Sequence, residues 1–261
     1  MSAVALQMTG AEVLKLRRKR GTLIWVLVLA LVPVIVLFAV RAIQHSSDVH
    51  KYGPAGGTSA FIDGLRVLCL FFGPLAAILV GVEAGTGDAS AGVFRDLVVT
   101  GRSRLALFAS RVPAALALCW SVMILGYGLI LAGTFGFASN LPTPDRALIL
   151  NGLGFTLLAT GVVCVVAVGF ASLTTSKPAA ITALIGWQLV ASPLIANISS
   201  LGSARRGVLS QAIVHFSPVH TGGGGRGATV TMSQGTALAV MAAWVVVFLV
   251  LGAWRTRRMD A

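Results

Sequence analysis

Charged side chains that could bind another molecule are concentrated in one short stretch of an otherwise apolar chain. Residues 81–104 read GVEAGTGDASAGVFRDLVVTGRSR. The stretch holds both signs of charge: Glu83, Asp88, Arg95, Asp96, Arg102 and Arg104. Its glycines predict that the chain leaves an apolar run and turns here: Gly81, Gly85, Gly87 and Gly92. The pattern from Ala89 to Val99 predicts a short helix.

That short helix has the composition of a docking surface. Val93, Phe94 and Leu97 are apolar points beside Arg95 and Asp96, and exposed apolar residues inside a charged rim are typical of contact surfaces. A simple connector between two helices needs only about 2–6 residues. The extra length therefore favours docking of a soluble partner over the alternative, a solvated connector.

Side chains for catalysis or metal binding form no recognisable motif. The histidines lie in polar stretches, with no HExxH or GxSxG nearby: His45, His50, His215 and His220. The cysteines lie in apolar runs without metal-ligand spacing: Cys69, Cys119 and Cys164. We therefore expect no enzymatic activity, no metal site and no cofactor bound by this chain. An intramembrane enzyme that uses His215 and His220 is the alternative.

A glycine run near the C-terminus invites comparison with a nucleotide-binding loop. Gly222, Gly227 and Thr229 have the spacing of a P-loop. Ala228 stands where that loop needs a Lys to reach the terminal phosphates. We interpret the run as a flexible loop instead.

One pair of charges lies at the start of an apolar run. Asp63 and Arg66 are three residues apart, which puts them on one helical face where they can pair. With His215 and His220 they could form the outer rim of a pathway, and an interfacial ion pair is the alternative. No ionisable residue lies near the centre of an apolar run, which argues against an ion-coupled carrier.

The elements that position these side chains are membrane helices. The chain has 261 residues, of which 56% are hydrophobic and only 11% charged, whereas a soluble domain carries about 25% charged residues. Six solidly apolar runs reach the roughly 20 residues that a spanning helix needs: 22–44, 61–82, 105–136, 147–172, 178–200 and 235–254. We predict an all-α polytopic membrane protein with six transmembrane helices, formed by residues 22–261.

Residues 1–21 predict a separate basic helix in the plane of the membrane. Thr9 and Glu12 have the spacing of a capping box, and Val13 and Leu16 would face the membrane. The basic side chains would contact lipid headgroups: Lys15, Arg17, Arg18, Lys19 and Arg20. A short solvated basic collar is the alternative.

The net charge of +12 comes from basic residues that flank apolar runs, so we expect contact with membrane lipids and no nucleic-acid binding. Most Lys and Arg fall on one side if the N-terminus is cytoplasmic. Six spans then put the C-terminus inside as well. Residues 83–104 become a cytoplasmic loop and residues 201–234 an extracellular loop, with a short helix and a glycine stretch.

Two further patterns bear on helix packing. Gly128, Ala132 and Gly136 recur every four residues, which gives a smooth face for close contact within a bundle or across a dimer. Prolines interrupt four of the runs and predict bends there: Pro33, Pro74, Pro113 and Pro193.

The order of these elements resembles the permease subunits of type-2 ABC exporters. The local match consists of short motifs: Glu83, Gly85-Thr86, Gly92-Val93-Phe94-Arg95-Asp96-Leu97 and Thr100-Gly101-Arg102-Ser103-Arg104. Arg111 stands near a position where family members often carry Lys, and Ser217-Pro218 resembles the family's sequence before its sixth span.

The resemblance implies the partners and the activity. The partners would be two cytoplasmic ABC ATPase subunits, which bind ATP and magnesium, and a second permease copy or a related permease. Docking of the ATPase subunits would involve Glu83, Val93, Phe94, Arg95, Asp96, Leu97, Arg102 and Arg104. The chain would export an amphipathic or lipid-like substrate across a prokaryotic plasma membrane. A non-ABC channel or carrier subunit is the alternative.

Overall fold

The regular structure of the chain is helical throughout the part that the computed structural model describes, which is residues 2–49, 51–90, 103–174, 176–218 and 230–258. Within those residues, six helices are long and apolar enough to cross a membrane. The predicted all-α fold with six spans is therefore confirmed. In chain order the spans are α2 (Arg20–Ser47), a continuous helix of α3 (Gly57–Arg66), η1 (Val67–Phe72) and α4 (Gly73–Ser90), then α6 (Arg104–Gly136), α7 (Arg146–Ala171), a second composite of α8 (Lys177–Gly186), η2 (Trp187–Ala191) and α9 (Ser192–Asn197), and α11 (Gln234–Arg258).

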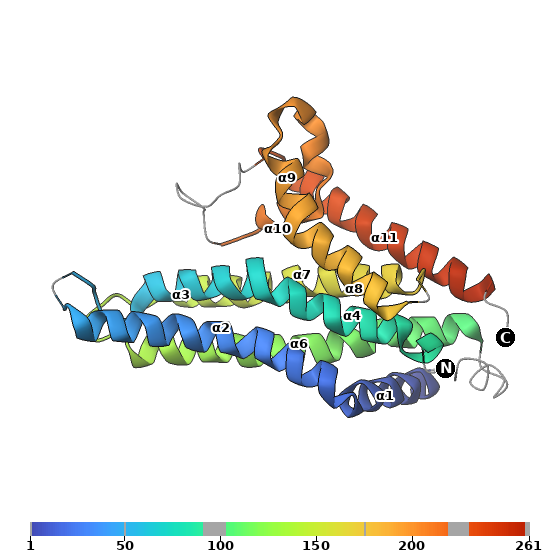
Figure 1. The fold of residues 1–261 in the computed structure, drawn as a ribbon, viewed down its shortest axis with the longest axis horizontal. Helices are drawn as coiled ribbons and strands as arrows, with labels where there is room; N and C mark the ends of the chain where they lie inside the picture. Colours follow the sequence, from blue (N-terminus) through green and yellow to red (C-terminus); the bar gives the residue numbers. More distant parts are fainter. Residues whose placement is uncertain (1, 50, 91–102, 175, 219–229, 259–261) are drawn as a thin grey trace.

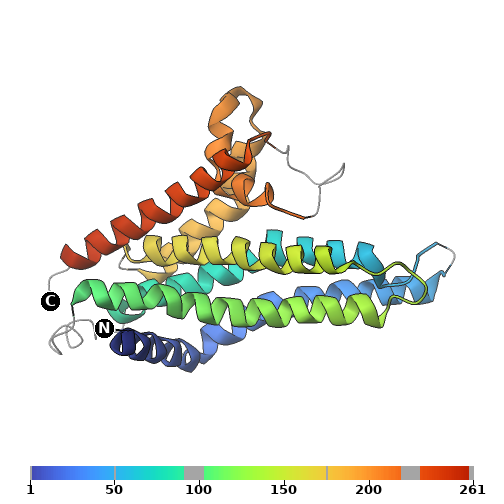
Figure 2. The ribbon, with the colours of Figure 1, turned by 180° about the vertical axis from the view of Figure 1, so that it is seen from behind.

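The first four spans run side by side as a bundle, and the last two lean away from it (Figures 1 and 2). Within the bundle α4 packs on α7, α2 and α6. The composite fifth span begins on α4 and leads through η3 (Ser199–Gly207) and α10 (Leu209–Val214) toward α11, on which α10 packs. The predicted short helix of the 201–234 loop is thus present, whereas its glycine stretch falls largely in 219–229, outside the described residues.

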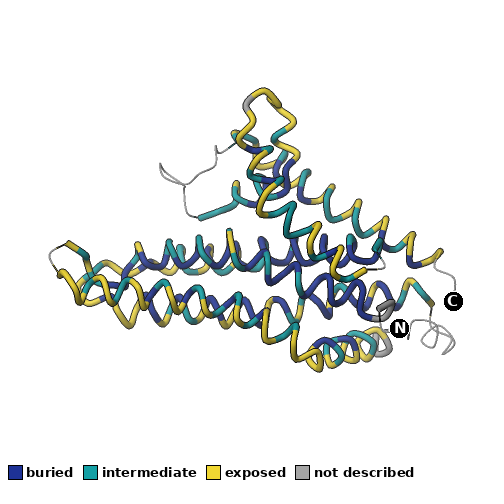
Figure 3. The backbone as a smooth tube through the Cα atoms, viewed as in Figure 1, coloured by how far each residue is buried: buried dark blue, intermediate teal, exposed yellow. Residues whose placement is uncertain are grey.

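Burial divides the spans into an inner and an outer group (Figure 3). In the most apolar 18-residue stretch of each span, the share of buried residues is 61% for α4 with its preceding turns and 67% for α7. The corresponding values are 22% for α2, 17% for the fifth span and 17% for α11. Three spans therefore present most of their apolar surface outward, to lipid or to another membrane protein.

Glycines set the tightest helix contact of the bundle. A Cβ atom on Gly81 would lie 2.6 Å from the Cys164 carbonyl oxygen, and one on Gly85 would lie 2.7 Å from the Val168 oxygen. Both residues lie inside α4, so the prediction that they turn the chain out of the membrane is wrong. They are spaced four apart and let α4 approach α7 closely, as small residues do between membrane helices.

The small-residue face predicted on the third span contacts no other described helix. Gly128, Ala132 and Gly136 are exposed, and a Cβ atom on either glycine would meet nothing within 4 Å. The glycines of α6 that do approach another helix are Gly126, near Ala30, and Gly133, near Phe38. Packing of Gly128, Ala132 and Gly136 against another described helix of this chain is therefore not observed, and their contact across a dimer stays a prediction.

Two of the four prolines follow a widened helical turn. The Gly73 N–H bonds to the Leu68 oxygen, and the Ser192 N–H bonds to the Trp187 oxygen, each five residues back. Pro74 and Pro193 come next, and proline cannot donate the regular helical hydrogen bond. The π segments η1 and η2 accommodate that loss. Pro33 and Pro113 lie inside continuous α-helices.

The N-terminal helix α1 (Ser2–Arg18) is present, but its start was wrongly predicted. It begins before Thr9, because the preceding Ala, Leu, Gln and Met residues favour helix. The Glu12 carboxylate binds Lys15 rather than capping the backbone. Lys19, with φ −78° and ψ 72°, separates α1 from α2. Leu16 is buried in the core and α1 packs on α6, so Leu16 faces protein rather than membrane. The in-plane orientation stays a prediction.

Candidate functional site at the basic end of the bundle

The last turns of α1 and α11 and the starts of α2, α6 and α8 lie at one end of the molecule (Figure 1), and all of them carry basic residues. Arg104 Nη1 donates to the Arg257 carbonyl oxygen at 3.2 Å, which joins the start of α6 to the last turn of α11. We call this region the basic end. Its basic residues are Lys15, Arg17, Arg18, Lys19, Arg20, Arg104, Lys177, Arg255, Arg257 and Arg258. The five residues predicted to contact headgroups are among them.

The charged stretch singled out in the sequence begins inside a helix. We predicted a loop from residue 83, but α4 continues to Ser90. Ser103 then caps α6, with its Oγ accepting from the Ala106 N–H at 3.2 Å. Arg104 is half-buried in the first turn of α6. The other predicted docking residues lie in 91–102, outside the described residues: Val93, Phe94, Arg95, Asp96, Leu97 and Arg102.

Glu83 lies at the centre of a polar cluster that joins three spans. Glu83 is only 4% exposed. Its Oε2 atom accepts a hydrogen bond from Thr22 Oγ1 at 2.8 Å and forms an ion pair with Lys177 Nζ. These partners belong to the first turns of α2 and α8. The side chain is therefore bound inside the chain, and its predicted role in docking an ATPase subunit stays a prediction.

A groove lies directly beside this cluster, between α2, α4 and α8. It has a volume of about 470 Å³, within the range of about 300–1,000 Å³ that is typical of ligand sites. Thr22 and Lys177 contribute its polar groups, and the remaining walls are largely apolar. Its lining consists of Gly21, Thr22, Trp25, Leu79, Lys177 and Ile181. The groove could hold a molecule with an apolar body and a polar group.

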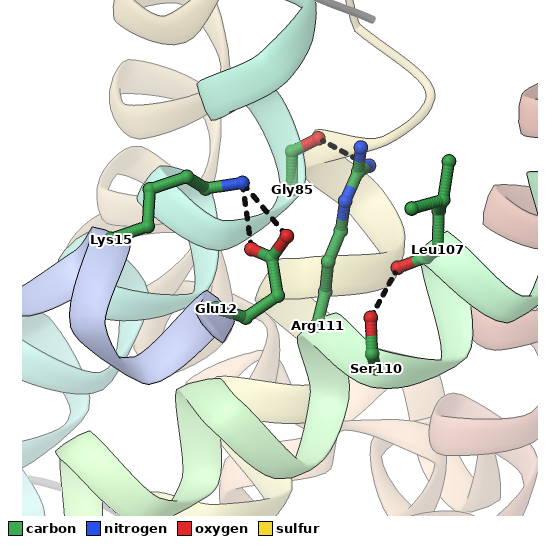
Figure 4. Close-up of polar contacts among 6 residues, drawn as sticks. All are labelled: Glu12, Lys15, Gly85, Leu107, Ser110 and Arg111. Atoms are coloured by element: carbon green, nitrogen blue, oxygen red, sulfur yellow. Dashed lines mark hydrogen bonds and ion pairs between the residues drawn. The ribbon is translucent and has the colours of Figure 1, made fainter. Parts of the chain in front are cut away.

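On the other side of α4, Arg111 connects α6 to the same turn (Figure 4). Arg111 is 4% exposed, and its Nη1 atom donates to the Gly85 carbonyl oxygen at 3.4 Å. The ion pair between Glu12 and Lys15 of α1, at 2.7 Å, lies in the same view. Arg111 is thus buried where α4 and α6 meet, with α1 packed on α6.

The charges predicted at the opposite end of the bundle form a small ion-pair network. Arg66 Nη1 lies 3.2 Å from Asp63 Oδ1, so the predicted pairing of these two residues is confirmed. Arg41 of α2 binds the other carboxylate oxygen, a partner that we did not predict. His215 is exposed after α10, which packs on α11, while His220 lies outside the described residues. Asp63 and Arg66 thus lie together, and the role of the four residues as an outer rim stays a prediction.

Sequence reasoning missed Thr22 and Lys177, although a signal for Lys177 was present. Lys177 stands at the start of one apolar run and Glu83 at the end of another, on the same side of the membrane in the predicted topology. Opposite charges at such positions can pair across helices. For metal binding, the described residues contain no group of three or more His, Cys, Asp or Glu side chains placed to hold an ion.

Comparison with known proteins supports a transport role for this architecture. A family model described as ABC-2 family transporter protein matches residues 9–190, which is more than half of the chain. The matched range includes Glu12, Glu83, Arg111 and Lys177. No curated protein matches the chain.

Proposed function

Since the chain belongs to the ABC-2 family of transporter membrane proteins, we propose that it is the membrane-spanning permease of an ATP-driven exporter. The observation that carries this proposal is the family match over residues 9–190 of a chain whose described residues include six helices able to cross a membrane. The chain itself is not the enzyme: a partner subunit would bind ATP and magnesium and hydrolyse the ATP.

The basic end faces the cytoplasm in this proposal. Lys and Arg accumulate on the cytoplasmic side of membrane proteins, and the basic end holds the last turns of α1 and α11 together with the starts of α2, α6 and α8. Both termini are then cytoplasmic. The basic side chains of α1 would contact anionic headgroups of a prokaryotic plasma membrane.

The ATPase subunits would dock around residues 83–104. This region connects α4 to α6. Because α4 and α7 are the two most buried spans, a force applied to this region would be transmitted to the centre of the bundle. Docking would use the side chains in 91–102 together with Arg104, while Glu83 would act inside the membrane domain. ATP binding would favour one of two packed states, since a ligand shifts a conformational equilibrium by its differential affinity.

A second permease copy or a related permease would complete the pathway. The exposed apolar faces of α2, α8 and α11 and the small-residue face of α6 are available for such a contact. The cargo suited to apolar walls with polar groups near their ends is an amphipathic or lipid-like molecule. The groove beside Glu83, with Lys177 at its polar end, supports this class of cargo.

The test is purification of the tagged chain from its native membranes, followed by measurement of Mg-ATP hydrolysis and ATP-driven transport in vesicles. A co-purifying subunit with the GxxxxGK[ST] phosphate-binding motif is expected. The double variant Arg95→Glu/Leu97→Glu should insert normally but lose the ATPase subunit and transport. Lys51→Glu, at the exposed opposite end, is the matched control. Transport that persists in the double variant, or that needs no ATPase subunit, would contradict the proposal.

A further inference from the structure

The ion pair between Glu83 and Lys177 is the principal polar link between the second and fifth spans. It joins α4, which leads into the proposed docking region, to the first residue of α8. The Glu83 carboxylate is almost fully buried, whereas the Lys177 side chain is 35% exposed. A buried carboxylate requires such a partner, because an unpaired charge away from water is strongly disfavoured.

Apart from this pair, α8 packs on α4 and α7 mainly through partly buried apolar side chains, Ile181, Leu184 and Ile185. Ala180 is the only buried residue of α8. In the most apolar stretch of the fifth span, 17% of the residues are buried. The π segment η2 follows α8 directly and precedes Pro193. Helices bend at such places because their hydrogen-bond ladder is already interrupted. Only residues 172–176 separate the end of α7 from the start of α8, so the start of α8 stays close to the bundle.

The contacts that the same turn of α4 makes with α7 and α6, around Gly85, are more closely packed. Gly85 is two residues beyond Glu83, about 200° further around the helix at about 3.6 residues per turn. There the backbone of α4 lies against Val168 and Ala171 of α7. The Gly85 carbonyl oxygen accepts a hydrogen bond from the Arg111 guanidinium. A displacement of the end of α4 would therefore carry α7 and α6 with it and would act on the contact with α8 first.

We propose that the Glu83–Lys177 ion pair is a releasable latch, which holds α8 against α4 and which opens to widen the groove beside it. The latch rests on the proposed function, in which ATPase subunits move the end of α4. When it opens, Lys177 reaches water and Thr22 remains as a hydrogen-bond donor to Glu83. Water entering the widened groove would solvate the carboxylate and lower the free-energy cost of separating the two charges.

The latch predicts that the groove wall becomes accessible when the ion pair is absent. Leu79→Cys would report this as its rate of reaction with a water-soluble maleimide, in the intact complex with Cys69, Cys119 and Cys164 replaced by Ala. These native cysteines are all buried. Lys177→Met should raise the nucleotide-free rate about tenfold, a coupling within the usual range for contacting residues. Lys177→Arg, which keeps the charge, should leave the rate low.

Exchanging the charges of Glu83 and Lys177 distinguishes an ion pair that opens during transport from one that stays closed. The double variant Glu83→Lys/Lys177→Glu restores the opposite charges and should restore the low rate without nucleotide. Mg-ATP with vanadate should raise the rate in the parent protein and in the double variant, but not further in Lys177→Met. Lys51→Cys, at the exposed opposite end, is the control and should react at one rate in every state.

The latch is overturned if Lys177→Met reacts as slowly as the parent protein, or if nucleotide leaves the rate low while the complex hydrolyses ATP. If Lys177→Met fails to insert, Lys177→Gln gives the same comparison with a smaller expected rise, since its amide carries no charge but can still donate a hydrogen bond to Glu83. A complex that lacks ATP hydrolysis contradicts the proposed function instead. The nucleotide-free comparison of the variants then still decides the latch.

Discussion

The two ends of the helix bundle solve the same electrostatic problem in different ways. Each places a carboxylate of the second span beside a cation from another span. At the opposite end Asp63 has a side chain that is 35% exposed and binds both Arg41 and Arg66. At the basic end Glu83 has a side chain that is 5% exposed and binds Lys177.

The difference concerns which helices are joined and how strongly. Asp63 joins two neighbouring spans that already pack along their length, and water shares its charge, so its contribution to stability is expected to be small. Glu83 joins the inner helix α4 to α8, and its carboxylate is almost fully buried, although the Lys177 side chain is 35% exposed. We infer that the opposite end is a structural rim, whereas the basic end is the region where movement is controlled.

The largest expected effect is the reversal of the buried charge. Glu83→Lys would place two cations side by side near Thr22, and breaking a buried pair typically costs about 3–5 kcal/mol. We expect loss of the folded protein or a large fall in its unfolding temperature in detergent. Asp63→Lys is the counterpart at the other end, where it would place a third cation beside Arg41 and Arg66, but solvent screens these partly exposed charges, so it should cost less than Glu83→Lys. Equal destabilisation by the two changes would remove the distinction between the ends.

Helix contact offers a second comparison between the ends. Gly85→Ala places a methyl group 2.7 Å from α7 atoms, and overpacking of this kind costs about 1–3 kcal/mol. Gly136→Ala, near the opposite end of α6, meets nothing within 4 Å and should change stability by less than about 0.5 kcal/mol. Thermal unfolding of both variants in detergent measures this. A stable Gly85→Ala protein would show that α4 and α7 can separate more easily than proposed.

The two arginines give a smaller difference. Arg111→Ala removes a hydrogen bond from a buried guanidinium to the Gly85 oxygen, and hydrogen bonds of charged groups contribute about 1.5–3 kcal/mol. Arg66→Ala removes one of two cations from a partly exposed carboxylate and should cost about 0–1 kcal/mol. Denaturation of the purified variants should rank Arg111→Ala as the less stable, and the reverse order would argue against the buried contact.

Salt provides the mildest comparison. Exposed ion pairs weaken as ionic strength rises, because the screening length falls from about 10 Å at 0.1 M to about 3 Å at 1 M. The small effect of Asp63→Asn on stability should therefore vanish at high salt, while the effect of Glu83→Gln should persist. A Glu83→Gln effect that disappeared in 1 M salt would mean that solvent reaches this pair freely.

The sequence was sufficient to predict the number and type of the spans, because a run of about 20 apolar residues has few other stable structures. The i,i+3 spacing also predicted the pairing of Asp63 with Arg66. Long-range partners could not be predicted in this way. The Glu83 carboxylate meets Thr22 and Lys177, which are 61 and 94 residues away in the chain.

Helix ends and glycines were less predictable for a physical reason. Gly81 and Gly85 are compatible with both a turn and a close helix contact, and only the presence of α7 selects the second. The same ambiguity led us to place a loop at residue 83, where α4 in fact continues to Ser90. Small residues at regular spacing on α6 had the correct pattern for packing, yet the helices that pack there use Gly126 and Gly133.

The central claim is that the basic end faces the cytoplasm and receives the ATPase subunits. Its most direct test is the reaction of a Ser90→Cys variant, in the background without native cysteines, with a membrane-impermeant maleimide in intact cells and in inside-out vesicles. The account predicts reaction only in inside-out vesicles, with slower reaction when the ATPase subunits are bound. Reaction of this cysteine in intact cells would contradict the orientation and, with it, the proposed coupling.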